Sequence, residues 1–84
     1  MEQAESLRII RLTEARNLCG LGKSSFYDRI KNGLLPPSIS LGGRAVGWVE
    51  CELNTVLKAM VSGKNEIEIK ALVIELTEQR QLLV

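Results

Sequence analysis

The sequence predicts a mostly α-helical domain with one small β-hairpin, and three observations support this fold class. Two short stretches of helical periodicity are separated by Gly20-Leu21-Gly22. Two runs of alternating apolar and polar residues flank Gly42-Gly43, and two further stretches of helical periodicity follow. The expected order is therefore helix, glycine turn, helix, hairpin, helix, helix. With 84 residues, the chain has the size of one domain with a small core.

The first helix is expected to follow Thr13 and to run to about Cys19. Thr13 is a suitable N-cap, because its hydroxyl can accept a hydrogen bond from an early helix N–H. The apolar, β-branched residues 7–12 before it suit a brief strand or an extended lead-in. Ala15 and Cys19 then share one helix face, and Gly20 ends the helix.

The second helix is expected at residues 23–32. Phe26 and Ile30 form its apolar stripe, while small polar and charged residues lie on the opposite side. Gly33 ends the helix, because a glycine adopts the left-handed conformation without steric cost. The prolines at 36–37 prevent any continuation.

Residues 38–48 are expected to form the β-hairpin, with a two-residue Gly42-Gly43 turn joining its strands. Arg44 follows the glycines, so it lies at the hairpin tip. Val46 and Trp48 alternate with Ala45 and a glycine, which predicts that both apolar side chains point inward.

Two more helices are expected after the hairpin. Leu53, Val56, Leu57 and Met60 recur at i, i+3, i+4, i+7 spacing. Asn65, with an acidic residue three positions later, is a suitable N-cap for the last helix. The complete order describes a winged helix-turn-helix with an extra C-terminal helix. We therefore divide the chain into a DNA-binding domain at 1–62 and a C-terminal helix at 63–84.

The C-terminal helix has two interpretations. It packs on its own small domain, or it mediates self-association, because its apolar residues spread over two faces. The second face consists of Ile67, Ala71 and Ile74. The residues predicted to serve self-association recur at roughly heptad spacing: Ile69, Leu72, Leu76 and Leu83.

The segment around Gly22-Lys23-Ser24 has the residue order of a phosphate-binding loop, which would indicate a nucleotide hydrolase. The full pattern GxxxxGK[ST] requires a glycine at position 17, where this chain has Asn17. The preceding residues also have a helical pattern instead of that of a buried strand. We therefore interpret the segment as the turn of a helix-turn-helix, whose second helix enters the DNA major groove.

The distribution of charge agrees with DNA binding. The net charge is only +1, but residues 8–47 carry seven basic and two acidic side chains, a local net charge of +5. Residues 48–84 carry four basic and six acidic side chains, a local net charge of −2. A cationic region attracts phosphate. The basic half of the chain is the half that contains the predicted helix-turn-helix.

Several predicted contacts with DNA have a structural alternative. Ser24 and Ser25 either touch DNA or stabilise the helix start, and Tyr27 either contacts a phosphate or packs. Arg16 is either a phosphate contact or a surface charge. Arg44 is expected to enter a minor groove or to bind its flanking phosphates; its alternative is a solvated turn residue. The residues predicted to bind DNA are Lys23, Ser24, Ser25, Tyr27, Asp28, Lys31, Arg44 and Arg16.

The composition argues against other classes of protein. Cys19 and Cys51 lie far apart and the chain has no histidine, so we predict two buried free thiols in a reducing cytoplasm and no metal site. No apolar run is long enough for a membrane span, which predicts a cytoplasmic protein. No positioned nucleophile and no clustered carboxylate pair suggests catalysis, so we expect neither an enzyme nor a cofactor.

The run from about Ile9 to Leu57 resembles the AlpA family of small prophage regulators. From Gly20 to Leu53 the chain has GLGKSSFYDRIKNGLLPPSISLGGRAVGWVECEL. Family members commonly show a pattern close to GLSRSTIYRLIKxGxFPxPxxLGxRxVGWxxxEV. The linked GLL-P, LGGR and VGW elements are its most specific parts. Asp28 stands where the family often has a basic or neutral residue, which implies a different target sequence.

The resemblance implies a MerR-like and excisionase-like winged fold that binds double-stranded DNA at prophage or integrative-element sites. It implies regulation of transcription there, often of integrase or excisionase genes. An architectural excisionase, or recombination directionality factor, is the alternative, and a protein-interaction adaptor is a further one. The expected partners are double-stranded DNA, further copies of the chain in a homodimer or higher homo-oligomer, and an integrase.

Overall fold

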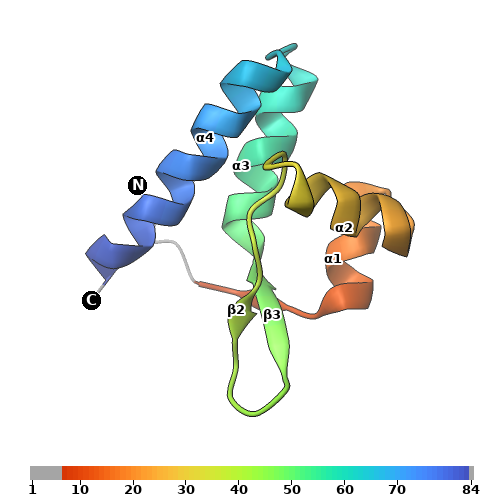
Figure 1. Ribbon diagram of the computed structural model, residues 1–84, viewed down its shortest axis with the longest axis vertical. Coiled ribbons are helices and arrows are strands. Elements are labelled where there is room, and N and C mark those ends of the chain that lie inside the picture. The colour runs from red at the N-terminus through yellow and green to blue at the C-terminus, as the bar shows by residue number, and fades with distance from the viewer. Residues whose placement is uncertain (1–6, 84) are drawn as a thin grey trace.

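In the computed structural model, which describes residues 7–83, four α-helices pack with a small three-stranded antiparallel sheet (Figure 1). The elements in chain order are β1 (Ile9–Ile10), α1 (Leu12–Cys19), α2 (Lys23–Lys31), β2 (Ile39–Ser40), β3 (Val46–Val49), α3 (Glu50–Val61), α4 (Glu66–Gln79) and the 3₁₀ helix η1 (Arg80–Leu83). This order confirms the predicted mostly α fold with a β-hairpin and an extra C-terminal helix.

Helices α1 and α2 are joined by the predicted glycine turn. Gly20 ends α1 with a φ of 69°, a left-handed conformation that glycine adopts readily. The Leu21 N–H then donates to the Arg16 carbonyl oxygen at 3.1 Å, which closes the turn. Gly22 is the N-cap of α2 and has an extended backbone. The turn is therefore tight, and it fixes where α2 begins.

The start of α1 differs from the prediction. The N-cap is Arg11 instead of Thr13, and it makes no side-chain capping hydrogen bond. Strand β1 ends at Ile10, so the chain enters the helix only one residue later. Thr13 consequently lies inside the first turn, where its hydroxyl is not at the capping position.

The sheet has the strand order β1-β3-β2, with β3 in the centre. The extended lead-in is therefore a third strand, paired with the hairpin. Gly47 lies at the centre of the sheet, where its neighbours leave no space for a side chain. A Cβ atom there would lie 2.6 Å from Ile9 Cγ2 and 3.2 Å from the Ile10 carbonyl oxygen. The partners in register are Ile9 with Val49, Ile10 with Trp48, Ile39 with Gly47, and Ser40 with Val46.

The connection between β2 and β3 is longer than predicted. The Leu41 N–H donates to the Ala45 carbonyl at 2.8 Å, and the Ala45 N–H donates to the Gly42 carbonyl at 3.1 Å. Three residues, 42–44, thus connect the last paired positions instead of two. The Gly42 N–H also donates to Ser40 Oγ at 3.2 Å, at the start of this connection.

We call residues 39–49, which comprise β2, β3 and their connection, the wing. Trp48 is buried as predicted, but Val46 is 39% exposed, so the prediction that Val46 points inward is wrong. The wing extends beyond the helical body (Figure 1). Its outer half therefore has no core to cover.

The core joins all four helices to the inner part of the sheet. Helix α4 shares this core, so it packs on the rest of the domain, and Asn65 and Glu68 form the predicted capping box at its start. The core residues are Ile10, Ala15, Phe26, Leu35, Trp48, Leu53, Val56, Ile69 and Val73.

Most of the residues predicted to serve self-association contact their own domain. Ile69 is buried, and Leu72 and Leu76 are partly buried against the core. The Leu83 side chain lies outside the described residues. Ile67 and Ile74, on the second apolar face of α4, are 79% and 59% exposed. That second face is therefore the one that α4 presents to solvent.

Candidate nucleic-acid interface

Helix α2 is amphipathic in the way that the sequence predicts. Phe26 is buried in the core and Ile30 is partly buried against it. These two residues fix α2 against the domain and leave its other side in solvent. The predicted DNA contacts on α2 are all exposed: Lys23, Ser24, Ser25, Tyr27, Asp28 and Lys31.

An aromatic cluster joins α2 to the wing. The Trp48 ring on β3 lies 5.2 Å from the Phe26 ring, centroid to centroid, with the planes at 69°. The Tyr27 centroid lies 6.4 Å from that of Trp48. Such edge-to-face arrangements add to the free energy of burial. Tyr27 is also 43% exposed, so its ring packs in the cluster while part of the side chain remains open to a ligand.

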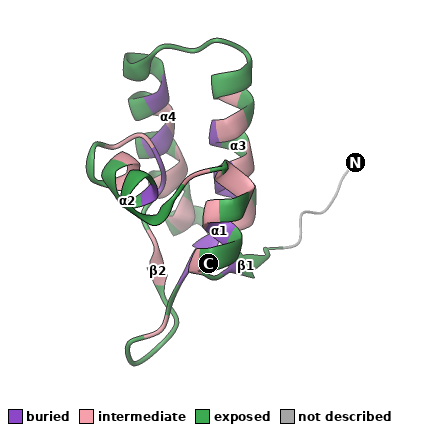
Figure 2. Cartoon of the chain, turned by 90° about the vertical axis from the view of Figure 1, so that its right-hand side faces the viewer, coloured by how far each residue is buried: buried purple, intermediate pink, exposed green. Residues whose placement is uncertain are grey.

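The wing tip lies on the same side of the molecule as α2. In Figure 2, α2 and the tip of the wing both occupy the left-hand side, one above the other, with α3 to their right. Arg44 in the tip is exposed. The two elements that the sequence predicts to contact DNA thus form part of one face.

Exposed cations on this face differ from Arg8 in their surroundings. Arg8 Nη1 lies 2.6 Å from Glu50 Oε2, and Arg8 Nη2 lies 2.6 Å from Glu14 Oε2. The hydrogen bond to Glu14 and the charges of both carboxylates raise the pKa of Arg8. Within residues 7–83, Lys23 and Arg44 have no carboxylate at salt-bridge distance. Among the described residues these two charges are therefore unpaired, whereas that of Arg8 is compensated by two carboxylates.

Arg16 has an intermediate position. Its side chain is half-buried, and its Nε atom is buried without a hydrogen-bond partner in the described part of the chain. Arg16 is therefore less accessible than the cations of α2 and the wing. Of the eight residues predicted to contact DNA, it is the one that is not exposed.

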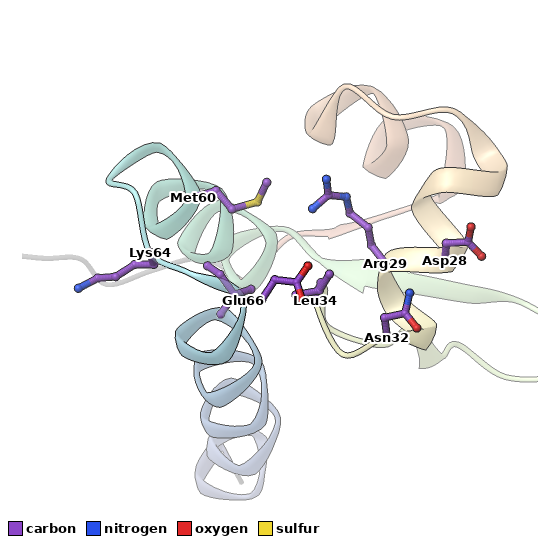
Figure 3. Close-up of a pocket in the computed structure, with 8 residues that line it drawn as sticks. Asp28, Arg29, Asn32, Leu34, Met60, Lys64 and Glu66 are labelled. Atoms are coloured by element: carbon purple, nitrogen blue, oxygen red, sulfur yellow. The ribbon is translucent and has the colours of Figure 1, made fainter.

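An open hollow of about 430 Å³ lies between the end of α2 and the α3–α4 turn. The Arg29 side chain extends across it towards Met60, whereas Asp28 points the other way (Figure 3). Arg29 is also close enough to Cys19 that its charge lowers the thiol pKa, although the larger effect of burial raises it. Arg29 is thus directed along the domain body.

The two thiols differ in environment. Cys19 is half-buried and Cys51 is exposed, and both are free. The prediction that both are buried is wrong for Cys51, because the helical turn that contains it directs Glu52 and Leu53, not Cys51, into the domain. Within the described residues, no group of three or more His, Cys, Asp or Glu side chains gathers as a metal site would require. None of the helices there combines the length and apolarity that a membrane crossing needs.

Sequence reasoning missed an ion pair beneath the wing. Arg80 Nη2 lies 2.6 Å from Glu52 Oε1, and both side chains are largely buried. Glu52 precedes Val56 by four residues, so helical periodicity places it on the core-facing side of α3, and this was the available signal. Nothing in the spacing identified Arg80 as the partner, 28 residues away.

Comparisons with known proteins identify the family of this chain. A family model described as "Prophage CP4-57 regulatory protein (AlpA)" matches residues 8–58, which include α1, α2 and the whole wing. The uncharacterized protein ORF88 of Enterobacteria phage P4 is 37% identical over 57 residues, which make up 68% of this chain. The chain spans 65% of the length of that relative. No solved structure matches the chain. Because the family match covers more than half of its residues, the chain belongs to the AlpA family of prophage regulatory proteins.

Proposed function

We propose that this protein is a sequence-specific DNA-binding transcriptional regulator of a prophage or integrative element. Helix α2 enters the major groove, and the wing contacts the adjacent minor groove or the phosphate backbone. The observation that carries the proposal is the arrangement of α2 and the wing tip on one side of the molecule (Figure 2). Membership of a family of regulatory proteins supports the same function.

Exposed cations supply the affinity in this proposal. Lys23 begins α2, Lys31 ends it, and Arg44 lies in the wing tip. Cations at both ends of a helix in the major groove, and on a wing beside it, are suited to phosphates on either side of the groove. Because phosphate neutralisation releases counterions, this binding weakens steeply with salt.

Polar side chains between these cations supply the specificity. Ser24, Ser25 and Asp28 are exposed along the outer side of α2. Hydroxyl groups donate to or accept from base edges, and a carboxylate accepts from the cytosine amino group. Tyr27 donates its hydroxyl to a phosphate while its ring packs on Trp48. Arg16, half-buried on α1, contributes a phosphate contact at the margin of the interface.

A second copy of the chain binds the exposed face of α4 in this proposal. Ile67, Ala71 and Ile74 lie along that face, and all three are exposed. Lys64 and Glu78 each lie seven residues from Ala71, on opposite sides. In an antiparallel pair of α4 helices centred on Ala71, Glu78 near the end of one helix lies beside the turn before the other copy's α4, where Lys64 precedes the Asn65 N-cap. Opposite charges there suit a twofold contact.

The test of the proposed function is retention of DNA in a gel shift, performed across a range of salt concentrations. We expect retention of mixed-sequence genomic fragments that falls steeply with salt, and tighter retention of a fragment from the neighbouring prophage promoter. A protein-interaction adaptor would show no salt-sensitive retention of either fragment. A reporter on the promoter then separates transcriptional control from excision, which is measured with purified integrase.

A further inference from the structure

The C-terminal segment reaches back to the base of the wing through one side chain. Arg80 Nε donates to Glu52 Oε2 at 2.8 Å, and Arg80 Nη2 donates to Glu52 Oε1 at 2.6 Å. The same Nη2 donates to the Pro37 carbonyl oxygen at 2.9 Å. One guanidinium group thus holds two segments that are distant from it in the sequence. We call Glu52, Arg80 and Pro37 the Arg80 bridge.

The two segments held by the Arg80 bridge flank the wing, one before it and one after it. Pro37 lies two residues before β2, and Glu52 lies three residues after β3. The wing is attached to the body through these ends, through the pairing of β1 with β3, and through Trp48, which packs in the core against Phe26. The direction in which the wing leaves the body therefore depends in part on how the bridge holds the chain on either side of the wing.

The segment before β2 is anchored by the buried side chains of Leu35 and Pro36, but its backbone makes few hydrogen bonds. Pro36 and Pro37 have no N–H to donate, and β2 is an edge strand of two residues that pairs only with β3. On the α2 side of the two prolines, the Leu34 N–H donates to the carbonyl oxygen of Arg29 in α2. The contact from Arg80 to the Pro37 carbonyl therefore fixes a stretch of chain that its own backbone holds weakly.

The geometry of the Arg80 bridge fixes the position of the Arg80 guanidinium relative to α3. The side chains of Glu52 and Arg80 are 8% and 19% exposed, so water competes little for their hydrogen bonds. The paired, two-bond geometry between guanidinium and carboxylate also fixes the orientation of the arginine, which a lysine cannot reproduce. Hydrogen bonding to Glu52 raises the pKa of Arg80, although burial opposes it, so the arginine remains charged.

We propose that Arg80 is a positioning residue for DNA binding, which fixes the base of the wing so that Arg44 is held on the same side of the molecule as α2. This inference rests on the proposed function. Arg80 lies outside residues 8–58, the part that the family model matches. The C-terminal segment thus contributes to DNA binding in this chain without touching the duplex.

A double-mutant cycle with Arg80→Met and Arg44→Ala tests the inference. Affinity is measured by fluorescence anisotropy with a labelled mixed-sequence duplex at low salt. Arg80→Met is expected to weaken binding about threefold to tenfold in the wild-type background and to have no further effect when Arg44 is already alanine. Arg80→Lys, which keeps the charge but not the two-bond geometry, is expected to recover only part of the affinity.

A second variant controls for destabilisation, because Arg80→Met leaves the buried Glu52 carboxylate without its partner. Glu52→Met with Arg80→Met removes both charges and preserves apolar packing. It still lacks the contact to Pro37, so it is expected to bind DNA as weakly as Arg80→Met. Circular dichroism establishes that both variants are folded before affinity is compared.

Hydrogen exchange tests the same inference without DNA. In either Arg80 variant the amides of Leu41 and Ala45, which are bonded across the wing, are expected to exchange faster than in the wild type, while the amide of Phe26 is unchanged. Equal exchange in the wing, or an equal loss of affinity with and without Arg44, would overturn the inference. If the wild-type protein fails to bind any duplex, the proposed function fails instead, and the exchange measurement still decides whether Arg80 fixes the wing.

Discussion

Trp48 of β3 packs edge-on against Phe26 of α2, with the two ring centroids 5.2 Å apart. Both side chains are fully buried. Trp48 is also the residue paired with Ile10 of β1, so the contact joins the sheet to α2 directly. The relative position of the wing and α2 therefore depends on a packed pair in the core, in addition to the Arg80 bridge at the base of the wing.

Replacement of Trp48 by alanine is expected to lower the free energy of unfolding by about 3–5 kcal/mol, because it removes the largest buried side chain and leaves a cavity beside Phe26. The measurement is urea-induced unfolding followed by circular dichroism. Val61→Ala, which truncates an exposed side chain at the end of α3, is the control and is expected to change stability by less than about 0.5 kcal/mol. Similar losses in the two variants would contradict the packing described for Trp48.

Gly47→Ala is expected to destabilise the fold by about 1–3 kcal/mol, because the new methyl group meets Ile9 and the Ile10 carbonyl. Chemical denaturation measures the loss. Gly22→Ser is the matched control: a Cβ at Gly22 meets nothing within 4 Å, and its φ of −73° suits any residue. A serine at this N-cap position is expected to leave stability unchanged or slightly higher. A Gly47→Ala variant as stable as the wild type would show that β1 does not pack closely on β3.

Ile67→Glu is expected to shift the protein towards monomer in sedimentation experiments at high concentration, because the charge lies on the face of α4 proposed to bind a second copy. The control is Val61→Glu, which places the same charge at another exposed apolar position. A contact limited to one helix of 14 residues is small, so the wild-type dimer is expected to be weak.

Charge reversal tests the antiparallel arrangement of that dimer. Lys64→Glu and Glu78→Lys are each expected to weaken the dimer, and the two together are expected to restore it, because every lysine again faces a glutamate. A dimer insensitive to Ile67→Glu, or two charge variants that do not compensate each other, would exclude this face of α4.

The local pattern predicted most of the fold, because caps and periodicity depend on near neighbours. Short stretches of sequence were sufficient to predict the Gly20 turn, the N-cap at Asn65 and the burial of Trp48. A brief strand before the first helix was one of two expectations, but its pairing with β3 and the partner of Glu52 could not be predicted, because both depend on contacts over long sequence separations. Val46 and Thr13 were mispredicted for the same reason. Val46 is exposed because the wing extends beyond the core, and Thr13 is not the N-cap because β1 ends at Ile10 and α1 begins directly afterwards.

The sequence predicted which side chains of the interface are exposed, but not which of its charges are paired or half-buried. The amphipathic pattern of α2 predicted which side chains face solvent, and all six of its candidates are exposed. The local excess of positive charge did not show that Arg8 is paired with Glu14 and Glu50, because those contacts join three separate segments. Likewise, the half-buried position of Arg16 depends on tertiary packing.

The central claim is that α2 and the wing tip contact one duplex together. The most direct measurement is the salt dependence of DNA affinity for Lys23→Ala, Arg44→Ala and the double variant, with Lys58→Ala on α3 as the control for loss of one exposed charge. We predict that the double variant binds far more weakly and that the negative slope of log affinity against log salt becomes shallower by about 1.8, the value for two lost phosphate contacts. Lys58→Ala is expected to leave the slope unchanged. Wild-type affinity and an unchanged slope in the double variant would contradict the claim.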